Sequence, residues 1–250
     1  EMFRVNVDGT RAVVAAAAAA GVRRIVFTSS AAVMGPPDGG AANEDSPHDG
    51  AFLSAYARSK YEAEQEFFAV TADAGIEGVA VNPSSVQGPG RATGSARLLL
   101  YGLRRRFPVV VPAAVSIVDI ADSSLGHLLA WRKGVAGERY ILSGSTIDIA
   151  DAVRLLGEVA GMRRTPIVAP RWLASVLGRP AAALAARISD SGFFCRETLD
   201  TLLAGSRYDG SKATRDLGLE YTPLEATLER TVRWLHDYGF VGRRLRRFGR

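Results

Sequence analysis

The chain is poor in two residue types, and each shortage excludes a class of structure. It holds one cysteine, Cys195, in 250 residues, which excludes a disulfide within the chain and agrees with a reducing compartment, the cytoplasm. It also holds only three lysines, so its net charge of +5 comes from arginine. This arginine-rich and alanine-rich composition is typical of GC-rich coding, and we expect no nucleic-acid partner.

Long hydrophobic runs are also missing. The apolar stretch from Val13 to Val22 is about ten residues, well short of the ~20 that span a bilayer, so it predicts a packed helix and no membrane partner. The arginine-rich end, residues 243–247, is expected to be a solvated tail. The three histidines, His48, His127 and His236, lack metal-ligand spacing, and we predict no metal site.

What the chain does have is an ordinary globular composition, with 47% hydrophobic and 23% charged residues. A buried strand is predicted over Arg24–Ser30, a helix over Ala55–Val70 and a second strand over Gly78–Asn82. This order is that of a βαβ unit in a parallel sheet, whose ligands lie beyond the carboxyl ends of the strands. Ser30 and Pro83 both fall at that edge.

The rest of the chain alternates short strands with helices. Strands are predicted at 115–118 and 138–142, and helices after residue 118 through 131 and at 147–160, 166–187, 199–203, 211–217 and 223–238. We expect an α/β fold: the C-terminal part of a Rossmann-type, doubly wound parallel sheet with an interleaved, mostly helical substrate-binding portion.

A glycine-rich turn that could hold the phosphates of a dinucleotide is absent. No Gly-x-Gly-x-x-Gly motif follows a strand, and the nearest stretch, Gly88–Gly94, contains a proline and is expected to be a loop. We therefore predict that the first half of the dinucleotide-binding domain precedes Glu1. Residues 1–90 are expected to form its second half, and residues 91–250 the remaining strands and the substrate-binding portion. By itself, the chain is expected to bind no dinucleotide tightly.

Tyr56 and Lys60 are the most informative pair. Residues four apart on a helix share one face. A phenol has a pKa near 10 in water, and a neighbouring ammonium favours its ionised form, which brings it closer to useful acid–base chemistry at neutral pH. A serine at the end of the preceding strand, Ser30, can hold the oxygen that gains or loses the proton. These are the parts needed to interconvert an alcohol and a carbonyl.

Eight stretches in order resemble the extended short-chain dehydrogenases/reductases, the NAD(P)-dependent epimerase/dehydratase superfamily. They are residues 6–10, 25–35, 56–60, 82–90, 118–122 with 137–144, 211–218 and 234–239. The resemblance implies that Tyr56 is the general acid/base, that Lys60 tunes it and binds the nicotinamide ribose, and that Ser30 orients the substrate oxygen. It also implies cofactor contacts from Thr28, Ser29, Pro83, Ser84, Ser85 and Val86. Asp119 and Asp122 are expected to cap and brace a helix.

Within the superfamily, the sequence favours the dihydroflavonol-4-reductase-like branch. Asn82 stands where sugar-nucleotide enzymes often have arginine, and Met34 replaces a common tyrosine. The resemblance implies an NAD(P)-dependent oxidoreductase that uses NADP or NAD, acts on a small-molecule substrate and allows a homodimer. Two alternatives stay open: an NAD-dependent nucleotide-sugar epimerase/dehydratase, and a catalytically silent fragment.

Overall fold

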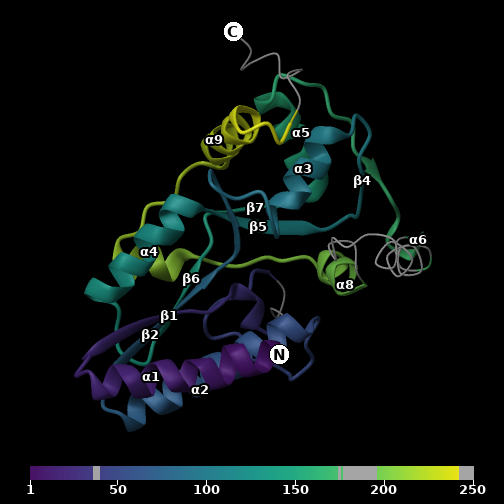
Figure 1. Cartoon of the computed structure of the whole chain (residues 1–250). Helices are drawn as coiled ribbons and strands as arrows, with labels where there is room; N and C mark the ends of the chain where they lie inside the picture. The colour runs from purple at the N-terminus through teal and green to yellow at the C-terminus, as the bar shows by residue number, and fades with distance from the viewer. Residues whose placement is uncertain (36–39, 174–175, 177–195, 242–250) are drawn as a thin grey trace. The chain divides into compact units, whose positions relative to one another are not determined.

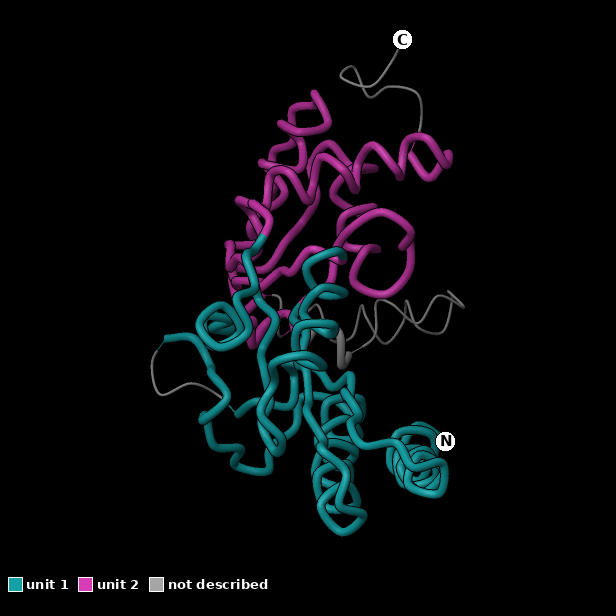
Figure 2. The backbone as a smooth tube through the Cα atoms, turned by 90° about the vertical axis from the view of Figure 1, so that its left-hand side faces the viewer, with its two compact units in different colours: residues 1–84, 121–143, 208–221 teal, residues 85–120, 144–207, 222–250 magenta. Residues whose placement is uncertain are grey.

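The computed structural model describes residues 1–35, 40–173, 176 and 196–241. Cys195, the arginine-rich end and much of the predicted helix at 166–187 lie outside these residues. The chain divides into two compact units that interleave in sequence, shown in two colours in Figure 2. The first unit contains residues 1–84, 121–143 and 208–221, and the second contains residues 85–120, 144–207 and 222–250.

The first unit carries nearly all of the predicted site residues. Its elements, labelled in Figure 1 where there is room, are η1 (Arg4–Asp8), α1 (Gly9–Ala19), β1 (Arg24–Thr28), η2 (Ala31–Val33), α2 (Ala55–Asp73), β2 (Glu77–Pro83), most of α4 (Ile120–Lys133), β6 (Arg139–Leu142) and η4 (Ala213–Leu217). The strands form a three-stranded parallel sheet in the order β1-β2-β6. The predicted βαβ unit is therefore confirmed, but its first strand, β1, lies at one edge of this sheet and is half-buried rather than buried.

Helices cover both faces of that sheet. Alternate residues of a strand face opposite sides, and an added Cβ at Gly78 of β2 would meet Thr71 and Phe67 of α2, so α2 lies on the face of Gly78. The next residue, Val79, faces Gly134, directly after α4. In the same way, Leu142 of β6 lies against Gly126 of α4. Glycine at these positions lets each helix approach the sheet closely, and the two faces make the sheet doubly wound.

Helix α2 begins and packs as its sequence predicts. The Ser54 hydroxyl accepts a hydrogen bond from the Ala57 amide at 3.1 Å, which caps the first turn. Phe67 is buried and its ring stacks on Phe27 of β1, with centroids 4.9 Å apart. The alanine-rich α1 packs beside α2 but buries only Val14, so it is less enclosed than the packed helix that the sequence predicts.

The second unit is built around apolar helices. Its elements are β3 (Ser85–Gln87), α3 (Ala96–Arg104), β4 (Val109–Val110), β5 (Ala114–Asp119), β7 (Ser145–Asp148), α5 (Ile149–Val159), β8 (Ile167–Val168), α6 (Arg171–Leu173), α8 (Arg196–Ala204) and α9 (Leu224–Asp237). Strand β5 pairs with β3 in parallel and with β7 antiparallel. Leucines of α3, α5 and α9 form the core. Asp119, at the end of β5, is buried and accepts a hydrogen bond at 2.5 Å from Arg230, which braces α9 as predicted.

The predicted elements differ from the structure mainly in the second unit. Residues 147–148 belong to strand β7, so the predicted helix at 147–160 begins at Ile149. Helix α3 and the short strands β3, β4 and β8 were not expected. These strands are two or three residues long, too short for a periodic pattern to indicate them. Within the described part of the chain, no helix is long and apolar enough to cross a bilayer.

Candidate functional site

Tyr56 and Lys60 lie one turn apart near the start of α2. Tyr56 is 46% exposed, so its phenol is open to a ligand. The Lys60 ammonium donates a hydrogen bond at 2.7 Å to the carbonyl oxygen of Thr28, the last residue of β1. It also lies 4.7 Å from the centroid of the Phe27 ring, within cation–π range. The helix that carries the predicted catalytic pair is thus joined directly to the carboxyl end of a parallel strand.

The surroundings of Lys60 act on its charge in opposite directions. Partial burial lowers the pKa of the Lys60 ammonium, because removal from water disfavours the charged form. The carboxylate of Glu64, one turn further along α2, raises the same pKa and offsets part of that effect. A lysine tuned in this way beside an exposed phenol suits acid–base chemistry.

Ser30 follows β1 directly and begins the short helix η2. Its hydroxyl accepts a hydrogen bond from the Ala32 amide at 3.2 Å, and its carbonyl oxygen accepts one from the Asn82 side chain at 3.3 Å. The residue is half-buried. Ser30 is therefore anchored at the carboxyl ends of both β1 and β2, where the sequence places it.

The neighbouring hydroxyls differ in their partners. Thr28 faces α4, where its hydroxyl lies 2.8 Å from Nε2 of His127. His127 Nδ1 lies 2.7 Å from the Ser123 carbonyl, which can only accept, so in the neutral ring Nδ1 donates and Nε2 accepts from Thr28. His127 thus links α4 to the carboxyl end of β1.

Two buried hydroxyls at this edge of the sheet have no hydrogen-bond partner among the described residues: those of Ser29 and Ser84. Buried polar groups are nearly always hydrogen-bonded, so two buried hydroxyls without partners point to a ligand with polar groups of its own. Ser84 follows Pro83, the last residue of β2. A dinucleotide, which carries hydroxyl, amide and phosphate groups, fits these residues.

Ser85 and Val86, also predicted to contact the cofactor, begin the second unit. They lie in β3, where they pair with Ile117 and Val118 of β5. Their predicted contact with a nicotinamide ring stays a prediction.

A buried polar cluster behind Lys60 was not expected from the sequence. The Glu64 carboxylate is fully buried; Asn82 donates a hydrogen bond to it at 2.6 Å, and Arg139 lies 3.2 Å from its second oxygen. Glu64 is four residues after Lys60, so the signal was the helical spacing itself. A Lys–Glu pair at that spacing is common on solvated helix faces, and the sequence does not reveal that this one is buried.

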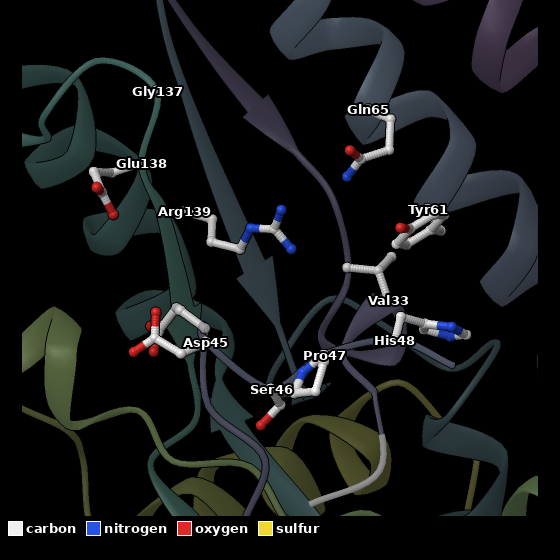
Figure 3. A pocket seen from close by; sticks show the side chains of 11 residues that line it. Val33, Asp45, Ser46, Pro47, His48, Tyr61, Gln65, Gly137, Glu138 and Arg139 are labelled. Carbon is white, nitrogen blue, oxygen red and sulfur yellow. The ribbon is translucent and has the colours of Figure 1, made fainter. Parts of the chain in front are cut away.

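A cavity of about 350 Å³ lies beside this cluster, between α2 and the start of β6. Figure 3 shows the Arg139 guanidinium extending from β6 toward Tyr61 and Gln65 of α2. Glu44 also lines the cavity, and burial raises the pKa of its carboxyl even though that carboxyl accepts a hydrogen bond from the Ile141 amide. The predicted catalytic and cofactor-binding residues do not line this cavity. In the described ranges, no group of three or more acidic, histidine or cysteine side chains could hold a metal ion.

Comparisons with known proteins place the chain in a family. Residues 1–133 match the model of the NAD dependent epimerase/dehydratase family. A putative dihydroflavonol 4-reductase of Synechocystis sp. is 33% identical over 195 residues, which cover 76% of this chain. Sterol demethylase protein B of Methylococcus capsulatus is 32% identical, and the match covers 96% of this chain and 75% of that protein.

Among solved structures, a nucleoside-diphosphate-sugar epimerase from Pseudomonas aeruginosa is similar at a TM-score of 0.73 with 26% identity; the match covers 92% of this chain and 72% of that one. The match to the Synechocystis protein covers only 57% of that protein's length. The order of motifs, the doubly wound parallel sheet and these matches agree. The chain belongs to the NAD-dependent epimerase/dehydratase family of extended short-chain dehydrogenases/reductases.

Proposed function

We propose that this chain interconverts a secondary alcohol and a ketone or aldehyde with NADP or NAD as the hydride carrier, and that Ser30, Tyr56 and Lys60 are its catalytic residues. One observation carries the proposal: the Lys60 ammonium is fixed at the carboxyl end of β1, one helical turn from an exposed tyrosine. Ligands of parallel α/β sheets bind at that edge.

In the direction of reduction, Tyr56 donates its phenolic proton to the substrate oxygen as the carbonyl carbon gains a hydride. The hydride comes from the reduced nicotinamide when it is bound. Lys60 favours the phenolate that remains on Tyr56 and so lowers the cost of giving up the proton. The Ser30 hydroxyl, held by the cap of η2, donates a hydrogen bond to the same substrate oxygen.

Most of the residues proposed to hold the dinucleotide belong to the first unit. The Lys60 ammonium has three hydrogens and uses one on the Thr28 carbonyl, which leaves donors for a ribose. The Ser29 and Ser84 hydroxyls are buried and lack hydrogen-bond partners among the described residues. Thr28, Pro83, Ser85 and Val86 complete the proposed set.

The proposal is tested by a panel of ketones and aldehydes with NADPH or NADH at saturating concentration. Tyr56→Phe keeps the ring and removes the proton, so we expect the rate constant for turnover to fall by about 10²–10⁴-fold. Tyr61→Phe, on the same helix but at the cavity, is the matched control and is expected to keep its activity. Undiminished turnover in Tyr56→Phe would refute the proposal.

A second candidate is an epimerase or dehydratase of nucleotide sugars, favoured by the similarity to the Pseudomonas aeruginosa structure. There the hydride is taken up and returned, so the dinucleotide is not consumed. Net oxidation of NAD(P)H in step with alcohol formation distinguishes the reductase. A sugar product formed with no net change in dinucleotide would assign the epimerase instead.

A further inference from the structure

The Glu64 carboxylate is fully buried, and the proposed reaction does not use it. It is on helix α2, one turn after Lys60, with 0% of its side chain exposed. An isolated buried carboxylate is costly, and such groups are retained where they have partners that matter. Its partners are Asn82 of β2, at 2.6 Å, and Arg139 of β6, at 3.2 Å.

Asn82 connects this carboxylate to the catalytic edge. Its side-chain amide faces two oxygens that can only accept, the Glu64 carboxylate at 2.6 Å and the Ser30 carbonyl at 3.3 Å, so the atom between them is the amide nitrogen. The amide oxygen is buried and has no hydrogen-bond partner among the described residues. The Asn82 side chain is therefore oriented by Glu64 and in turn holds the backbone of Ser30.

We propose that Glu64 and Asn82 are positioning residues of this site: the carboxylate counters the Lys60 charge from within the same helix, and Asn82 relays its position to Ser30. This inference rests on the proposed roles of Ser30, Tyr56 and Lys60. It adds buried residues that do not touch the substrate: Glu64 affects the charge of Lys60, and Asn82 affects the position of Ser30.

Several elements contribute groups to the surroundings of Lys60. They are Tyr56 and Glu64 on α2, the Thr28 carbonyl and Phe27 ring on β1, Arg139 on β6 behind Glu64, His127 on α4 bonded to the Thr28 hydroxyl, and Asn6 on η1, whose side chain donates to Ser59. Among them, Glu64 is the anion whose charge acts on Lys60, and it raises the Lys60 pKa against the effect of burial.

The chain is well suited to a direct test because it contains only three lysines. Labelling the lysine side chains with ¹³C at Cε gives three NMR signals, each of which reports the titration of one ammonium. In Glu64→Gln the shape and the contact with Asn82 are kept and the charge is lost. We expect Lys60 to release its proton about tenfold more readily, as the loss of a partly shielded charge within several ångströms predicts.

Glu138→Gln is the matched control, since the Glu138 carboxylate pairs with Lys212 at 2.5 Å. Because this carboxylate is paired with a different lysine, its loss should leave the Lys60 titration unchanged. Arg139→Gln provides a second variant with the opposite sign: loss of the cation behind Glu64 should make Lys60 hold its proton more tightly. If Glu64→Gln does not fold, the Lys60 titration in Arg139→Gln tests the inference instead.

An unchanged Lys60 titration in Glu64→Gln would overturn the inference. If only Arg139→Gln folds, a Lys60 pKa that is unchanged or lower in that variant would overturn it. Because the titration needs neither substrate nor dinucleotide, its failure is distinguishable from failure of the proposed reaction. The geometric half is tested by Asn82→Asp, which places an acceptor against two acceptors. The Ser30 amide signal should shift in Asn82→Asp, and an unmoved signal would remove Asn82 from the proposal.

Discussion

The two units of the chain are stabilised in different ways. The first places ionisable groups in partly or fully buried positions, and the pKa is shifted at Glu44, Lys60, Tyr208 and Tyr221. The second is held by an apolar core in which Leu156, Leu228 and Leu235 are almost fully buried. Buried polar groups cost stability unless they are fully paired, whereas apolar packing contributes stability at every pH. Most of the ionisable groups with shifted pKa values therefore lie in the first unit, whereas the second combines a large apolar core with an ion pair between the buried Asp119 and Arg230.

The largest expected effect tests the apolar unit. Leu228→Ala removes a side chain that is 1% exposed in the core of α3, α5 and α9. We expect the free energy of unfolding to fall by about 3 kcal/mol, with no dependence on pH between 6 and 11, roughly as core truncations do. Urea denaturation measures it. Leu128→Ala, at a residue 57% exposed, is the control and should change little. If the loss of unfolding free energy in Leu228→Ala depended on pH, the proposed difference between the two units would be wrong.

An intermediate effect is expected from two tyrosines of the first unit. Burial raises the pKa of both Tyr208 and Tyr221 to about 12. A tyrosine with a raised folded-state pKa stabilises the fold fully below about pH 10, and that stability is lost as the pH rises toward 12. We expect a loss of about 2 kcal/mol for each tyrosine. Urea denaturation of Tyr208→Phe and Tyr221→Phe across this range should show a smaller alkaline loss than wild type. An equal loss would show that other groups cause it.

The smallest effect is expected at Glu44, beside the cavity. Burial raises the pKa of its carboxyl, so the folded state favours the protonated form. The stability linked to that proton is present below the ordinary value of 4.5 and is lost as the pH rises through the folded-state pKa. The free energy of unfolding of Glu44→Gln minus that of wild type should therefore increase as the pH rises from 4 to 7, by roughly 1 kcal/mol or less. Thermal unfolding at both pH values measures it, and a constant difference would argue against the assignment.

Much of the first unit could be predicted from the sequence because its signals are local. The hydroxyl run at the end of β1, the serine before α2 and the proline that ends β2 each mark a boundary, and the Tyr56–Lys60 spacing needs only a helix. The second unit was harder, because β3, β4 and β8 are too short to show a period. A sequence likewise does not reveal that a carboxylate such as Glu64 is buried, since burial depends on what β2 and β6 bring against it.

The hydrogen bond between Lys60 and the Thr28 carbonyl has a consequence for ligand binding. A free lysine side chain carries roughly 2 kcal/mol of rotational entropy, which is lost when it is ordered. Here the contact with the carbonyl and the Phe27 ring orders Lys60 as the chain folds. A ligand that bonds to this ammonium meets a donor already restricted in direction, so the affinity gained from that bond is reduced little by the ordering of the side chain.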